Sequence, residues 1–137
     1  MISSYNISTQ TLDANDLLVF SANRILTGCT VTHTENSTTF RLNKPGYYYV
    51  SFNGISATQG TAGTVTVVLQ SNGVSIPGAE ASGYSAATTN LVNLSFAAIV
   101  KVSPSCGCVD NSVVLTFQNT GVDATYENAN VNITKLC

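Results

Sequence analysis

The sequence is short of charge. Only 9% of its 137 residues are Asp, Glu, Lys or Arg, against roughly 25% in an average soluble domain. Five Lys and Arg residues against seven carboxylates leave no basic surface to neutralise phosphates, so we expect no nucleic-acid binding. The five cations are scattered along the chain, and we interpret them as solubilising edges and loops. No apolar run reaches the roughly 18 residues of a membrane span, so no membrane partner is expected.

Residues suited to catalysis are also scarce. His33 is the only histidine, and a nucleophilic Ser or Cys needs a base within hydrogen-bond reach. His33 alternates with threonines, which indicates an exposed or hydrogen-bonded strand residue. Asp13 and Asp16 lie in a predicted turn, and their spacing needs nothing beyond turn chemistry. We therefore expect no enzyme activity and no cofactor.

The four cysteines are Cys29, Cys106, Cys108 and Cys137. The first six residues lack the basic and apolar segments of a secretory signal, which predicts folding in a reducing cytoplasm. We therefore expect free, buried thiols rather than disulfides, although the sequence leaves their redox state open.

Metal sites receive little support. The Cys106-Gly107-Cys108 pair has no second pair at zinc-finger spacing, so no zinc site is expected. Asp110, Asp123 and Glu127 could bind Ca²⁺ through oxygen, but their spacing matches no known calcium loop.

What the chain does contain is Ser, Thr and Asn, which make up 47 of the 137 residues. With 44% hydrophobic residues, the chain is long enough for one core. Apolar residues alternate with polar ones in short segments separated by turn signals, and no segment has helical periodicity. These features predict an all-β sandwich of two antiparallel sheets with eight to ten strands, forming one domain over residues 1–137.

Three strands show the alternation clearly. In the strand 47–55, Tyr48, Val50 and Phe52 share one face, while Tyr47 and Tyr49 share the other. The strand 90–102 and the next strand carry apolar faces that include Leu94, Phe96, Leu115 and Phe117. Asn72-Gly73 predicts a tight hairpin, Pro77-Gly78 a turn, and 81–89 a loop.

The segment Phe40 to Phe52 resembles the signature strand of the tumour necrosis factor and complement globular-head superfamily. In that superfamily an aromatic residue precedes a Pro-Gly turn, here Pro45-Gly46, that opens onto a Tyr- and Phe-rich strand. The Asn72-Gly73 hairpin and the long strand Leu91 to Val102 also match, and the similarity extends to Leu136. The closing strand departs from the usual Phe-x-Gly-x-Leu ending, so strand pairing there is open.

The resemblance implies a jelly roll that assembles as a trimer. It places Tyr48, Val50 and Phe52 in the core, and it points Tyr47 and Tyr49 toward neighbouring subunits, with Tyr126 as a further partner. The alternative for Tyr47 and Tyr49 is that a loop covers them.

A second resemblance is to small stand-alone proteins of bacteriophages and prophages. It is carried by Pro77 to Ala81, Thr88 to Phe96, Pro104 to Cys108 and Leu115 to Tyr126. This similarity implies a virion structural protein made in the bacterial cytoplasm, most simply a trimeric decoration protein on the capsid surface. Its partners would be its own copies and the major capsid protein or another virion protein.

Two other functions remain open from the sequence. One is a trimeric receptor-binding or adhesin head on a phage tail or bacterial surface, and the other is a spore-surface protein. No charged residue occurs between Lys44 and Glu80, and this stretch includes the tyrosine-rich strand. We therefore expect much of the surface to be interface.

Overall fold

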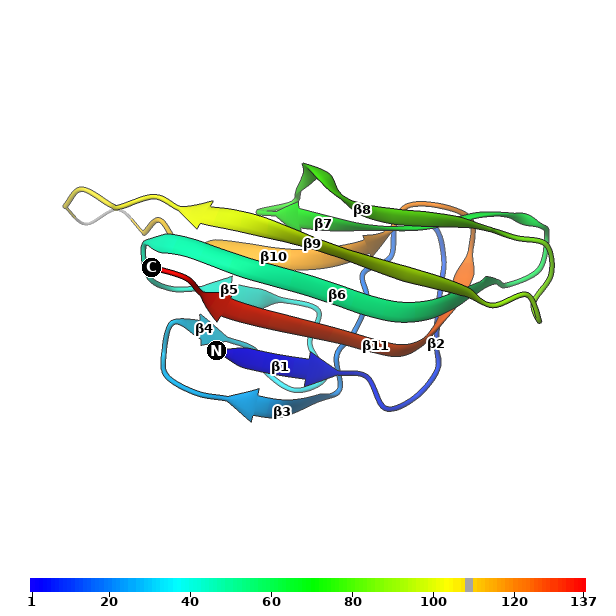
Figure 1. Ribbon diagram of the computed structural model, residues 1–137, viewed down its shortest axis with the longest axis horizontal. Coiled ribbons are helices and arrows are strands. Elements are labelled where there is room, and N and C mark those ends of the chain that lie inside the picture. Colours follow the sequence, from blue (N-terminus) through cyan, green and yellow to red (C-terminus); the bar gives the residue numbers. More distant parts are fainter. Residues whose placement is uncertain (108–109) are drawn as a thin grey trace.

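Two antiparallel sheets lie face to face in the computed structural model, which describes residues 1–107 and 110–137 (Figure 1). The first sheet, here called the β6 sheet, has the order β3-β1-β11-β6-β9, with β2 also paired to β11. Its strands are β1 (Ile2–Tyr5), β2 (Gln10–Leu12), β3 (Ala22–Leu26), β6 (Gly46–Thr58), β9 (Val92–Val102) and β11 (Ala124–Lys135). The second sheet has the order β4-β5-β10-β7-β8. Its strands are β4 (Val31–Thr32), β5 (Phe40–Leu42), β7 (Gly63–Ser71), β8 (Val74–Ser85) and β10 (Val113–Asn119).

The predicted all-β, two-sheet architecture is confirmed, and the described residues form eleven strands rather than eight to ten. The additional strands are short ones. β2, β3 and β4 have three, five and two residues, which is too short for alternation to be read. In the part of the chain that the structure describes, no helix is long and apolar enough to cross a membrane.

The core fills the space between the sheets. Six of the residues expected there are buried: Tyr48, Val50, Phe52, Leu94, Leu115 and Phe117. The seventh, Phe96, is only partly buried but stacks on Phe52, with ring centroids 5.5 Å apart. Phe52 in turn stacks on Phe117 at 5.4 Å and so joins the two sheets. Burying each such aromatic side chain stabilises the fold by about 1.5–3 kcal/mol.

The hairpin predicted at Asn72-Gly73 joins β7 to β8. Both residues have positive φ, 51° and 81°, as a tight hairpin turn requires. The Asn72 side-chain oxygen also accepts a hydrogen bond from the backbone N–H of Val114 at 2.9 Å, which fastens the turn to β10.

Strand β8 contains a wide bulge where the sequence predicted a turn. Gln70 pairs with Ser75, but Val68 pairs with Glu80, so three extra residues leave the ladder around Pro77-Gly78. Pro77 has no N–H to donate and Gly78 has a φ of 80°, so on this edge strand the pair interrupts the ladder without ending the strand. The predicted loop over 81–89 is therefore wrong for its first half, because β8 continues to Ser85.

A second bulge lies in β11. Glu127 pairs with Ile55 and Asn130 with Asn53, so one extra residue is inserted, and Asn128 there has a φ of 52°. The insertion reverses which residues face the core. Before it, Ala124 and Tyr126 are buried. After it, the buried residues are Ala129, Val131 and Ile133.

Candidate functional site

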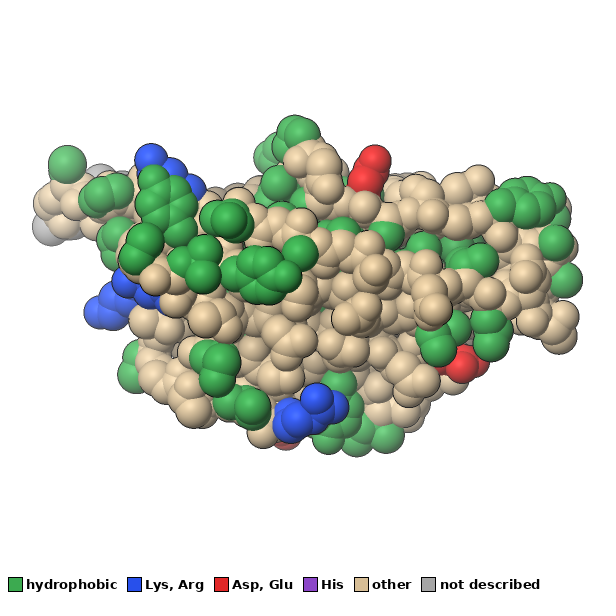
Figure 2. All heavy atoms as spheres, viewed as in Figure 1, with side chains coloured by type: hydrophobic (Ala, Val, Ile, Leu, Met, Phe, Trp, Pro, Cys, Tyr) green, Lys and Arg blue, Asp and Glu red, His purple; other side chains and the backbone are tan. Residues whose placement is uncertain are grey.

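The outer face of the β6 sheet carries an exposed apolar patch. Tyr47 and Tyr49 lie on this face with 45% and 43% of their surface exposed, while Tyr48 between them is fully buried. On the neighbouring strand β9, Ile99 is opposite Tyr49 and is 62% exposed. We call Tyr47, Tyr49, Ala97 and Ile99 the tyrosine patch. Figure 2 shows apolar side chains gathered here, over the ends of β6 and β9 that lie near the C-terminus.

Between Lys101 at one end and Glu127 at the other, the rest of this face is polar and uncharged. Its outward side chains on β6, β9 and β11 form what we call the neutral band, which appears as a broad area without charge in Figure 2. The neutral band comprises Ser51, Asn53, Asn93, Ser95, Asn130 and Asn132. Only Lys101, Glu127 and Lys135 are charged on these three strands. The face can therefore be covered with little cost of desolvating ions.

The covering loop considered for Tyr47 and Tyr49 is absent from the described structure, because both side chains remain almost half exposed. Each ring combines apolar area with a hydroxyl group that can hydrogen-bond. Aromatic side chains of this kind, beside uncharged polar residues, are typical of the centre of protein–protein interfaces.

Tyr126 does not belong to this surface, and its predicted place in a subunit interface is wrong. The side chain is fully buried between the sheets. Its hydroxyl donates to the Asn119 side-chain oxygen at 2.8 Å and lies 3.3 Å from the carbonyl of Thr66. Burial raises the pKa of this phenol far above its ordinary value. The Asn128 bulge shifts the alternation within β11, so that Tyr126 shares the buried face with Ala129, Val131 and Ile133.

The expectation of buried cysteines is also wrong. Cys29, Cys106 and Cys137 are free and exposed, because they lie in loops or at the chain end rather than on the alternating strands. Cys108 lies outside the described residues. Within the described ranges, no three His, Cys, Asp or Glu side chains come together as metal ligands would.

His33 is buried and hydrogen-bonded rather than exposed. Its Nδ1 lies 2.7 Å from the side-chain oxygen of Asn23, and its Nε2 lies 3.2 Å from the carbonyl of Ser37. The ring stacks on Phe40 at 4.3 Å. Burial lowers the pKa of His33, while the Ser37 carbonyl and the Glu35 charge act in the opposite direction. These contacts give His33 a structural role between β4 and β5.

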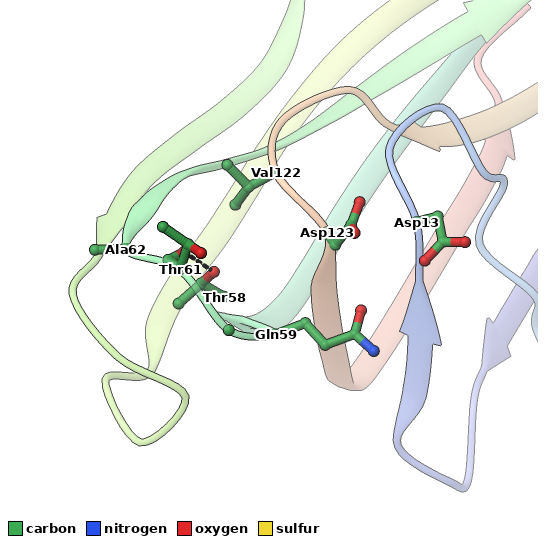
Figure 3. A pocket seen from close by; sticks show the side chains of 8 residues that line it. Asp13, Thr58, Gln59, Thr61, Ala62, Val122 and Asp123 are labelled. Carbon is green, nitrogen blue, oxygen red and sulfur yellow. Dashed lines mark hydrogen bonds between the residues drawn. The ribbon is translucent and has the colours of Figure 1, made fainter.

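The carboxylates considered for calcium do not come together as a group. Asp110 forms an exposed ion pair with Arg41 at 2.6 Å, beside the start of β10. Asp123 precedes β11, at the other end of the sandwich (Figure 1). There it lines an open cleft of about 530 Å³ together with Asp13 and Gln59 (Figure 3).

The turn predicted around Asp13 and Asp16 is present at this cleft. The backbone N–H of Asp13 donates to a carboxylate oxygen of Asp16 at 3.1 Å, and that of Ala14 donates to Asp123 at 2.9 Å. Across the cleft, the Thr58 hydroxyl donates to the carbonyl of Thr61 at 2.5 Å (Figure 3). The cleft therefore contains carboxylate, amide and hydroxyl groups. Several of these groups already form hydrogen bonds within the surrounding loops.

The sequence matches no family profile. No curated protein matches it either. Solved structures do match across almost the whole chain. Murine APRIL, in a crystal at pH 5.0, has a TM-score of 0.65 at 9% identity, over 98% of this chain and 97% of APRIL. The PRD1 vertex protein P5 has a TM-score of 0.58 at 15% identity, over 99% of this chain and 96% of P5.

At such low identity these similarities establish the fold. Their near-complete coverage of both chains agrees with the strand order of the two sheets and with the resemblance seen in the tyrosine-rich strand. The chain therefore has a tumour necrosis factor-like jelly-roll fold.

Proposed function

We propose that this protein is a structural component of a bacteriophage virion, and specifically a trimeric decoration protein on the capsid surface. The observation that carries the proposal is the outer face of the β6 sheet, where an exposed tyrosine patch adjoins a band without charge. The similarity in fold to a phage vertex protein supports the virion setting.

The tyrosine patch supports self-association. Covering exposed apolar area contributes roughly 25 cal/mol per Å². The charged residue that borders the patch, Lys101, pairs with Tyr47 at its edge and leaves Tyr49 and Ile99 without a charged cross-strand partner. The neutral band would add hydrogen bonds without desolvating ions. Two further copies of the chain are the partners proposed for this face, and a capsid or other virion protein is proposed for the assembled trimer.

The oligomeric state tests the first half of the proposal. Light scattering during gel filtration should give three times the chain mass of 14.3 kDa. Tyr49→Lys should produce monomer, because it places charge at the centre of the patch. Val74→Lys is the matched control, because Val74 is 70% exposed in the β7–β8 hairpin, away from the patch. A monomeric wild-type protein, or a trimer unaffected by Tyr49→Lys, would contradict trimerisation through this face.

Particle composition tests the second half. The chain should co-sediment with purified virions in a fixed ratio to the major capsid protein, and antibody-gold should decorate capsids rather than tails. Label confined to the tail would instead favour a receptor-binding head. The open polar cleft around Asp13, Gln59 and Asp123 is the feature that favours that second function, and specific binding of the isolated protein on a glycan array would support it.

A further inference from the structure

The charged side chains, scattered in sequence, are sorted in space. Four of the five Lys and Arg residues lie at the end of the sandwich where β9 and β11 finish, and Figure 2 shows basic side chains there. We call this the cationic end; it comprises Arg41, Lys44, Lys101 and Lys135. These four cations, scattered along the sequence, are therefore neighbours in space.

Strand pairing brings the cations together. Lys101 pairs with Tyr47 and Lys135 with Tyr48 at the start of β6, directly after the turn that carries Lys44. Arg41 precedes the same turn on β5. The only carboxylate among the described side chains of this end is Asp110, which Arg41 neutralises. Within the described residues, Lys44, Lys101 and Lys135 form no ion pair with a carboxylate side chain.

The opposite end is acidic. Glu127 pairs with Ile55, and the carbonyl of Asp123 accepts a hydrogen bond from the N–H of Gln59, just past the end of β6. Asp13 and Asp16 lie in the adjoining turn. We call these four carboxylates the acidic end. From Tyr47 to Gln59 the strand spans on the order of 40 Å, several times the roughly 8 Å screening length of physiological salt, so the two ends act independently.

Apolar groups accompany the cations. The Lys101 ammonium lies 6.0 Å from the centre of the Tyr47 ring. Leu136, whose N–H donates to the carbonyl of Tyr47, is 52% exposed. Three exposed cysteines belong to the same end. The carbonyl of Cys29 accepts a hydrogen bond from the Asn43 side chain in the β5–β6 turn, Cys106 lies in the loop after β9, and Cys137 follows β11. A mixture of cations and apolar side chains is suited to binding a protein surface. Binding to a row of phosphates depends instead on a dense stripe of basic residues.

We propose that the cationic end docks on an acidic protein surface of the particle, and that the acidic end points away from it. This inference rests on the proposed virion function and adds an orientation to it. Complementary charge would steer the molecule so that this end meets the particle first. The four carboxylates at the other end would repel an acidic surface and disfavour the inverted arrangement.

A defined acidic probe tests the docking chemistry without a particle. A fluorescent peptide of twelve glutamates should bind the wild-type protein at low salt, with an affinity that falls as salt rises. Lys44→Glu should weaken binding by roughly tenfold. Arg24→Glu makes the same change in charge on β3, outside the cationic end, and should leave binding within twofold of wild type.

Four results would overturn the docking proposal. They are absence of peptide binding, an equal loss in Arg24→Glu, equally tight binding of duplex DNA or phosphatidylserine vesicles, and a sedimenting mass that grows at low salt. The last result would mean that the acidic end of a second copy is the occupant.

Thiol accessibility tests the orientation on purified virions. Cys29 and Cys137 should react with a maleimide in the free protein and be protected on the particle, as read from their peptides by mass spectrometry. In a Gln59→Cys variant, the thiol at the acidic end should react with the maleimide both in the free protein and on the particle. Protection of position 59 with reactive Cys29 and Cys137 would overturn the orientation. If the chain is absent from virions, the proposed function is wrong. The peptide experiment would still test separately whether the cationic end binds an acidic partner.

Discussion

Tyr126 and Asn119 form a buried polar pair that holds three segments together. The Asn119 side-chain oxygen accepts from the Tyr126 hydroxyl. Its side-chain nitrogen donates to the carbonyls of Val122 at 3.0 Å and Asp13 at 3.2 Å. The pair thus fixes the β10–β11 turn and the turn after β2. Its position explains why a tyrosine, rather than a wholly apolar residue, occupies this place in the core.

Removing the hydroxyl isolates the contribution of this pair. Tyr126→Phe should lower the free energy of unfolding by about 1–3 kcal/mol, because the oxygen of Asn119 loses its buried donor. Urea unfolding followed by circular dichroism measures the change. Tyr84→Phe is the matched control, since Tyr84 is 63% exposed and should change stability by less than about 0.5 kcal/mol. Equal stability of the Tyr126→Phe and wild-type proteins would refute this role.

His33 should make stability depend on pH. Burial lowers its pKa in the folded protein below the ordinary value of 6.5, so the unfolded chain binds more protons between these two values. Acidification from pH 7 through 6.5 should therefore lower the free energy of unfolding, until the folded pKa is passed. Comparison of urea midpoints for wild type and His33→Gln across this range isolates the effect. If the wild-type protein instead gained stability relative to the variant on acidification, the predicted pH dependence would be wrong.

Among the elements, those with unbroken alternation could be predicted from the sequence. In β9, and in β6 as far as Ser56, side chains alternate between core and surface. In β10 the large apolar residues Val113, Leu115 and Phe117 share the buried face. Each large aromatic residue of these strands could therefore be placed on its correct face. β11 and β8 could not be predicted as well, because each contains extra residues. A bulge leaves hydrophobic residues on both sides of it, and only the partner strand shows where the alternation changes.

The β11 bulge can be tested through Asn128. At a φ of 52°, asparagine and glycine are tolerated, whereas a β-branched residue is strained. Asn128→Val should therefore lower the free energy of unfolding by about 1–2 kcal/mol, and Asn128→Gly by less than half as much. Chemical denaturation of the two variants in parallel measures the difference. Equal losses would mean that the backbone conformation at this position is not what selects asparagine.

At the scale of the whole molecule, the candidate surfaces depend on contacts between distant parts of the chain. Tyr47 and Tyr49 were identified from one strand, but Ile99 joins them only because β9 pairs with β6. The cationic end likewise needs β5, β9 and β11 to finish at the same place. The positions of the cations in the sequence give no indication of this clustering, so the cationic end could be identified only from the three-dimensional structure.

Association through the tyrosine patch should couple stability to concentration. If the native state is a trimer and the unfolded state a monomer, the melting temperature rises with protein concentration by mass action. Scanning calorimetry over a hundredfold range of concentration should show this rise for the wild-type protein. Tyr49→Lys should melt at one temperature throughout. A wild-type melting temperature that does not change with concentration would argue against a trimer in this range.

The bulge in β8 affects how readily neighbouring copies of the chain could aggregate through their edge strands. A regular exposed edge strand offers its free N–H and C=O groups as a template on which another chain can add a strand, and this is a route to aggregation. In β8 that row is broken around Pro77-Gly78, where three extra residues leave the ladder. On a particle of the kind proposed, neighbouring copies would therefore meet at β8 an edge that is a poor template for cross-β growth, and they could be packed densely while remaining folded as separate sandwiches.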